Sequence, residues 1–212
     1  MILDQSENNK RIAKNTLLLY FRMFFTMAVT LYTSRVILKA LGVEDFGIYN
    51  VVAGIVTLFS FFSGALSSAA SRFISFELGS NNTSYLSKVF SAIFIIHLLF
   101  SVVVVCFAET IGLWVVNCKL TIPPERIFAA HVVYQFSVFS CIVGIMQIPL
   151  NAMIIAHERL GIYAYMSICE VIGKLSIAFV VTYCSFDHLI VYGMLLFSLV
   201  VIPVSYTHLR AH

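Results

Sequence analysis

Residues 87–108 read SKVFSAIFIIHLLFSVVVVCFA, an apolar run in which Lys88 is the single charged residue. A run of about 20 such residues is long enough to cross the hydrocarbon core of a bilayer as a helix. Five further apolar blocks repeat the pattern, and short polar loops separate them. We expect spans at about residues 15–38, 48–70, 87–108, 127–154, 161–183 and 187–204. The sequence therefore predicts an all-α fold, a polytopic transmembrane helix bundle of about six spans.

The composition excludes a water-soluble globule. Of the 212 residues, 60% are hydrophobic and 11% are charged, and the mean hydropathy is +0.97. A soluble domain carries about 25% charged residues. The net charge of +3 is small and scattered, which does not favour a nucleic-acid partner. Because the chain has no P-loop, GxSxG or HExxH motif and no paired-cysteine metal site, we predict neither nucleotide hydrolysis nor a cofactor.

The five cysteines are dispersed and odd in number, so they do not form a disulfide framework. Two of them, Cys118 and Cys184, fall at span ends on the same predicted side of the membrane. We expect free thiols, with a bond between these two as the alternative.

The polar residues 1–14 are expected to be a cytoplasmic segment that is retained, because no cleavable signal peptide precedes the first span. Lysine and arginine near span ends set the orientation of a bundle. With the N-terminus inside, the inner side holds Lys10, Arg11, Lys14, Arg72, Lys88 and Arg159, and the outer side holds Arg35, Lys39, Lys119 and Arg126. This bias favours a cytoplasmic N-terminus.

The final residues 205–212, SYTHLRAH, depart from the apolar pattern. We interpret them as translated sequencing-adapter sequence and a non-native tail; a natural cytoplasmic tail is the alternative. Under the first interpretation the chain is a truncated piece of a longer membrane protein.

Arg22 is the charge that we expect to matter most. It lies about 10 Å along the first predicted span, where ionisable groups are expensive and face a bundle interior or a wet cavity. The alternative is that it snorkels to the interface. Arg35 lies near the other end of that span and is more simply explained as an interfacial anchor. Arg72, at the cytoplasmic end of the second span, either follows a close-packed helix face or stands at the mouth of a polar cavity.

Two features of later spans are further candidates. Glu170 and Lys174 lie four residues apart in the fifth span, in the favourable order for an ion pair. The pair is structural, or Glu170 titrates and couples transport to an ion, or Lys174 contacts an anion. Pro149 interrupts the fourth span, which predicts a kink and a candidate hinge.

The loop between the first two spans, LGVEDFGIY (41–49), resembles the L-G-x-x-x-[FY]-G-x-[YF] signature of the polysaccharide-biosynthesis transporters. These are the oligosaccharide flippases of the multidrug/oligosaccharidyl-lipid/polysaccharide exporter superfamily. Three more stretches read like bacterial members of this group: IGLW (111–114), PPER (123–126) and IIAHER (154–159).

The resemblance implies one N-terminal lobe of a two-lobe transporter that works by alternating access. Its substrate would be an undecaprenyl-pyrophosphate-linked oligosaccharide, for O-antigen or capsule synthesis, carried across the bacterial inner membrane. The partners would be that lipid-linked oligosaccharide, the bilayer and the missing C-terminal lobe. The cavity cations of the family would correspond to Arg22 and Arg72.

Three alternatives remain open at this point. A drug or cation antiporter of the same superfamily should carry acids without the excess of bases formed by Arg22, Arg72 and Lys174 over Glu170. A membrane glycosyltransferase would use Glu44 and Asp45 in the first outer loop, although acids there also favour the start of the second helix. The third alternative is an inactive fragment.

Overall fold

The structure, a computed structural model, describes residues 2–80, 83–157 and 160–210. Arg159 of the orientation argument, the end of the IIAHER stretch and residues 211–212 of the tail lie outside these ranges. Within them the chain is helical and contains no strand, which confirms the all-α fold. The elements are α1 (Ile2–Thr57), α2 (Ser60–Gly79), α3 (Thr83–Phe107), the π-helix η1 (Ala108–Gly112), α4 (Leu113–Cys118), the 3₁₀ turn η2 (Pro124–Arg126), α5 (Ile127–Ala156), α6 (Leu160–Thr182) and α7 (His188–Arg210).

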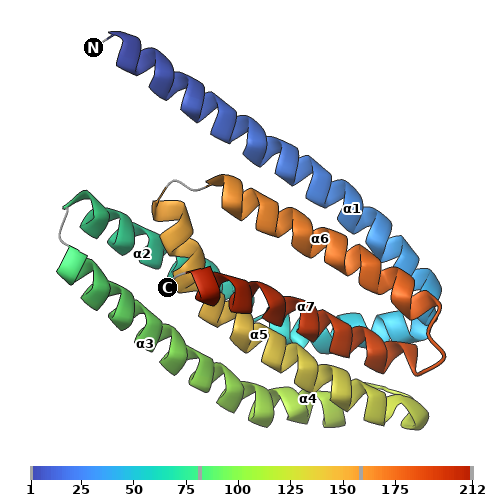
Figure 1. Ribbon diagram of the computed structural model, residues 1–212. Helices are drawn as coiled ribbons and strands as arrows, with labels where there is room; N and C mark the ends of the chain where they lie inside the picture. Colours follow the sequence, from blue (N-terminus) through green and yellow to red (C-terminus); the bar gives the residue numbers. More distant parts are fainter. Residues whose placement is uncertain (1, 81–82, 158–159, 211–212) are drawn as a thin grey trace.

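The helices form a bundle whose chain runs back and forth between two ends (Figure 1). One end holds the beginnings of α1, α3 and α6 and the ends of α2 and α5 (Figure 1). We call it the N-terminal end, and we call the other, where α1 bends and α7 begins, the kink end. Helix α5 lies centrally and packs against α1, α2, α3, α6 and α7. Its buried residues include Ala130, Val133 and Tyr134.

Four described helical stretches are long and apolar enough to cross a membrane: Thr16–Thr57, Tyr85–Cys118, Pro124–Ala156 and Gly161–Thr182. A shorter apolar helix covers His188–Ile202. These stretches coincide with five of the six predicted spans. They support a membrane protein, and α7 continues past residue 204 into the unusual tail.

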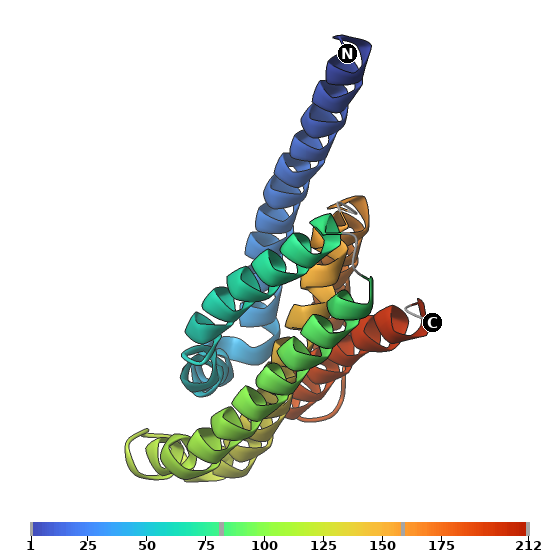
Figure 2. The same cartoon turned by 90° about the vertical axis from the view of Figure 1, so that its left-hand side faces the viewer.

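The first two predicted spans meet at a kink instead of a loop. Helix α1 runs on through residue 42, where Gly42 adopts φ 77° and ψ 171°. Glycine is the residue that enters this backbone region at low cost, because it has no Cβ. Gly42 therefore ends the first helical stretch within the predicted loop, but the chain resumes as helix at once and turns back into the bundle (Figure 2).

The second predicted span, 48–70, is divided between α1 and α2. At the junction the amide of Phe59 donates to the Val56 carbonyl at 3.1 Å, a tighter pattern than that of an α-helix. The hydroxyl of Thr57 donates to the Gly54 carbonyl at 2.8 Å. Side-chain hydroxyls that bond to the backbone compete with the helical pattern. Thr26 makes the same kind of bond inside an unbroken part of α1, so the bond of Thr57 accompanies the interruption without being its cause. Hydropathy does not reveal this interruption.

The third predicted span is longer than expected, because the helix continues through the π-turn η1 to Cys118. The hydroxyl of Tyr134, on α5, donates to the Ala108 carbonyl at 2.7 Å and stabilises this turn. Gly112 leaves the space for that hydroxyl: a Cβ at residue 112 would collide with it. Trp114 is exposed, as expected of an interfacial residue, and the Lys119 ammonium lies 5.1 Å from the centre of its ring.

We expect Gly42→Ala to lower the free energy of unfolding by about 1–3 kcal/mol, because the new Cβ is forced into a strained backbone conformation. Gly47→Ala is the matched control. Gly47 has no positive φ, and a Cβ there would meet nothing within 4 Å, so this change should be neutral or mildly stabilising. Thermal unfolding of the purified chain in detergent, followed by circular dichroism, measures both. Equal melting temperatures would show that the kink is not strained.

Candidate functional site

Arg22 points from α1 into the bundle and contacts α6. Its Nη1 donates a hydrogen bond to the Ser167 hydroxyl at 3.3 Å, and its Cζ lies 4.7 Å from the centre of the Tyr163 ring. An arginine over an aromatic face is held by a cation–π attraction. The Nε atom is buried and has no hydrogen-bond partner among the described residues. Arg22 therefore has the inward orientation that its depth in the span predicted, with one donor unused.

Glu170 and Lys174 continue the same face of α6. They form the ion pair that their spacing predicted, with 2.7 Å between Nζ and Oε1. Their side chains are 42% and 43% exposed, so neither charged group is buried. Together with Tyr163 and Ser167 they make a polar stripe along α6, because residues three, four and seven apart share one side of a helix.

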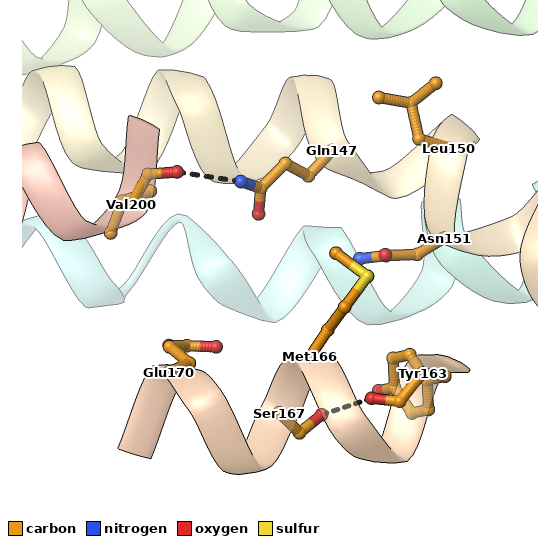
Figure 3. Close-up of a pocket in the computed structure, with 8 residues that line it drawn as sticks. All are labelled: Gln147, Leu150, Asn151, Tyr163, Met166, Ser167, Glu170 and Val200. Carbon is orange, nitrogen blue, oxygen red and sulfur yellow. Dashed lines mark hydrogen bonds between the residues drawn. The ribbon is translucent and has the colours of Figure 1, made fainter. Parts of the chain in front are cut away.

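A cavity of about 150 Å³ lies between α5, α6 and α7 beside this stripe (Figure 3). Figure 3 shows the Asn151 amide and the Glu170 carboxylate reaching into the space between α5 and α6. The Gln147 amide donates to the Val200 carbonyl of α7 at 2.9 Å, which fixes its position. The lining residues are Gln147, Leu150, Asn151, Tyr163, Met166, Ser167, Glu170 and Val200.

A second cavity, of about 380 Å³, lies between the second half of α1, α5 and α7. The polar residues that line it include Lys174, Tyr49, Thr57, Ser137 and Ser140. The two serine hydroxyls donate their protons to carbonyls of α5, each at 2.8 Å, so their oxygens are left to act as acceptors. Val200 lines both cavities, and the Glu170–Lys174 pair therefore stands between them.

The cavity amides Gln147 and Asn151 were missed by the sequence analysis. A usable signal existed: two carboxamides four residues apart in an apolar span share one helix face. Pro149 lies between them, buried in a helix that continues past it. Proline has no amide hydrogen, so the carbonyl of Ile145 loses its usual helical partner there. A hinge at this position remains a prediction.

Arg72 is not part of this cluster. It is exposed on α2, lines neither cavity and makes no hydrogen bond or ion pair among the described residues. The structure brings together Arg22, Glu170 and Lys174 along α6. A cavity role for Arg72 stays a prediction from resemblance.

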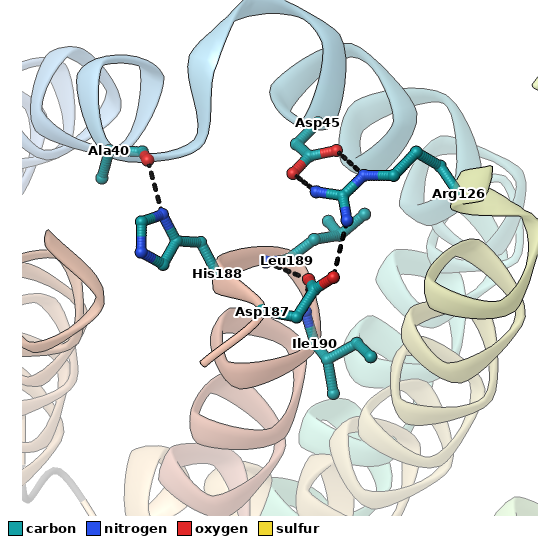
Figure 4. A network of polar contacts seen from close by, with 7 residues as sticks. All are labelled: Ala40, Asp45, Arg126, Asp187, His188, Leu189 and Ile190. Atoms are coloured by element: carbon teal, nitrogen blue, oxygen red, sulfur yellow. Dashed lines mark hydrogen bonds and ion pairs between the residues drawn. The ribbon is translucent and has the colours of Figure 1, made fainter. Parts of the chain in front are cut away.

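A second polar network ties the kink end together (Figure 4). Asp45 is buried, at 6% exposure, and both its oxygens accept hydrogen bonds from the Arg126 guanidinium. Arg126 also donates to Asp187 at 2.6 Å, and Asp187 in turn accepts the backbone amides of Leu189 and Ile190 at the start of α7. The network joins the kink of α1 to the beginnings of α5 and α7.

This network adds to the interpretation of the connection between the first two predicted spans. Asp45 lies in the first turn of the helix that resumes after Gly42, where an acid is favourable, and it also anchors an ion pair with a distant arginine. Glu44 is exposed. A nearby ring nitrogen, Nδ1 of His188, lies 3.0 Å from the Ala40 carbonyl at the end of the first half of α1. All five cysteines are free, so the alternative of a Cys118–Cys184 bond is wrong.

No family model, curated protein or solved structure matches the chain. The likeness to oligosaccharide flippases therefore depends on the four quoted stretches of sequence.

We expect Arg126→Ala to destabilise the bundle by about 3 kcal/mol, because it leaves the buried Asp45 carboxylate without a counter-charge. Arg35→Ala is the control: Arg35 is exposed and unpaired among the described residues, so its loss should cost less than about 0.5 kcal/mol. Thermal unfolding in detergent compares the two. Similar losses in both variants would show that the network does not hold the kink end.

Proposed function

We propose that this chain is one lobe of a transporter that moves a lipid-linked oligosaccharide of the undecaprenyl-pyrophosphate type across the bacterial inner membrane, for synthesis of lipopolysaccharide or another surface polysaccharide. The observation that carries the proposal is the placement of Arg22. In an apolar bundle, its guanidinium is turned onto Tyr163 and Ser167, beside a polar cavity.

The charges near the cavities favour an anionic substrate. Arg22 and Lys174 are positive and Glu170 is negative, which leaves an excess of one positive charge along this face of α6. Guanidinium groups bind phosphate through paired hydrogen bonds, and the unused Nε of Arg22 is available for one of them. A transporter of organic cations would need the opposite excess.

The neutral lining supports a sugar-bearing substrate. Carboxamides such as Gln147 and Asn151 donate and accept, and the serine hydroxyls of the larger cavity accept. Hydroxyl-rich groups need both kinds of partner. Loose recognition by several such groups suits a polymer whose individual sugars differ.

The working cycle in this proposal is alternating access with the N-terminus in the cytoplasm. The missing C-terminal lobe would cover the open side of the cavities, and Pro149 would supply the bend in α5. Arg72, at the N-terminal end of the bundle, would attract the anionic headgroup before it reaches Arg22.

We expect Arg22→Ala, introduced into the full-length protein, to abolish export of surface polysaccharide while membrane insertion is unchanged, because the headgroup loses its inward cation. Complementation of a bacterial strain that lacks its own flippase measures export, and Arg35→Ala is the matched arginine control. Normal export by the Arg22 variant would refute the proposal. Efflux of an organic cation such as ethidium, lost in the same variant, would favour the antiporter instead.

We expect Glu44→Gln to leave export unchanged. A glycosyltransferase that used this exposed acid would lose activity in the same variant. Glu44 is the cleaner residue for this test, because replacing Asp45 also breaks its pair with Arg126. Loss of polysaccharide in the Glu44 variant, with normal protein levels, would support the enzyme.

A further inference from the structure

We propose that Glu170 is a built-in counter-ion, which occupies an anion site between Arg22 and Lys174 until a diphosphate group displaces it. The inference rests on the proposed function and adds to it the group that fills the anion site while no substrate is bound.

The spacing along α6 places a carboxylate between two cations. Arg22 bonds to Ser167, and Lys174 bonds to Glu170. With a rise of 1.5 Å per residue, Glu170 lies about 4.5 Å along the helix from Ser167 and about 6 Å before Lys174. The two cationic anchor points are thus about 10 Å apart along the axis. Two linked phosphates span more of that interval than a single phosphate, which favours a diphosphate ligand.

The ion pair also lies where a ligand must pass. Glu170 lines the smaller cavity and Lys174 lines the larger one, and the two cavities share Val200. Any group that replaces the carboxylate beside Lys174 gains contact with both cavities. An ion pair that only stabilised the helix would not need to border a cavity, whereas this pair borders two.

Two observations argue against a purely structural role. The pair is close to half exposed, and exposed pairs of this kind stabilise helices by less than about 1 kcal/mol, so a more highly charged anion can displace the carboxylate. The Nε of Arg22 is a buried donor with no partner among the described residues. Unpaired buried donors are costly, and a ligand oxygen would satisfy this one.

Glu170 is the one negative charge among the residues that line the two cavities. Arg22 approaches this face from α1, and Lys174 and the neutral Tyr163 lie on α6. The neighbours from α5 and α7 are the uncharged Gln147, Asn151 and Val200. Removing the charge of Glu170 therefore frees Lys174 for a bound anion.

The test is equilibrium binding of inorganic pyrophosphate and of farnesyl pyrophosphate to the purified chain in detergent at one fixed pH. The Glu170→Gln variant should bind both roughly five- to tenfold more tightly than the unaltered chain. Because the ligand carries the same charge in both measurements, that charge cancels in the comparison of the two proteins.

Further variants separate this inference from the proposed function. Lys174→Gln should weaken binding, and Glu109→Gln, a neutralised acid that lines neither cavity, should leave it unchanged. A Glu170→Gln protein that binds no more tightly than the unaltered chain overturns the counter-ion, even if Arg22→Ala abolishes binding. Binding that survives Arg22→Ala refutes the role of Arg22 in the proposed function, whatever Glu170 does.

The two probes identify the source of the diphosphate. If Glu170→Gln tightens the binding of both probes and farnesyl pyrophosphate binds more tightly than inorganic pyrophosphate, the ligand is a lipid headgroup. If Glu170→Gln tightens both and the two probes bind equally well, Glu170 is the counter-ion at a site for a free diphosphate. Should the Gln variant fail to fold, Lys174→Gln decides the question, because unaltered binding in that variant also overturns the proposal.

Discussion

A bilayer offers no hydrogen-bonding partner to the peptide backbone, and the rest of this structure depends on that constraint. It explains why the chain stays helical where a soluble protein would form a loop. At Gly42 the chain changes direction and is helical again within a residue. At residues 108–112 the helix widens into a π-turn instead of ending, and a tyrosine from α5 satisfies the Ala108 carbonyl. At Phe59 shorter-range bonds replace the helical ones.

The same constraint governs the charges. Asp45 is the most deeply buried acid that the structure describes, and it is matched by the paired hydrogen bonds of Arg126. Arg22 is only partly matched, by one hydroxyl and one aromatic ring. The full pairing of Arg126 indicates a fixed structural role. The incomplete pairing of Arg22 indicates a place where a ligand can supply the absent hydrogen-bond acceptor. Hydropathy alone does not distinguish these two arginines.

Much of the fold could be predicted from the sequence, because apolar runs and their length depend on local composition. The inward direction of Arg22 followed from its depth, and the Glu170–Lys174 pair followed from helical spacing. The Asp45–Arg126–Asp187 network could not be predicted, since its members are far apart in the chain and meet only after α1, α5 and α7 have packed. The two cavities depend on tertiary contacts, and the division of the second span depends on local backbone bonding at Phe59 that hydropathy does not report. The resemblance groups Arg72 with Arg22, and the sequence does not reveal that Arg72 is exposed on α2 and lines neither of these cavities.

The collision that a Cβ on Gly112 would make with the Tyr134 hydroxyl has a consequence for the evolution of this chain. A side chain at 112 is compatible with this packing only when residue 134 places no hydroxyl there, whereas glycine at 112 accepts residues with or without one. A change at 134 therefore has to come first, and it removes the donor that satisfies the Ala108 carbonyl of the π-turn. Related sequences with a side chain at 112 should accordingly lack tyrosine at 134.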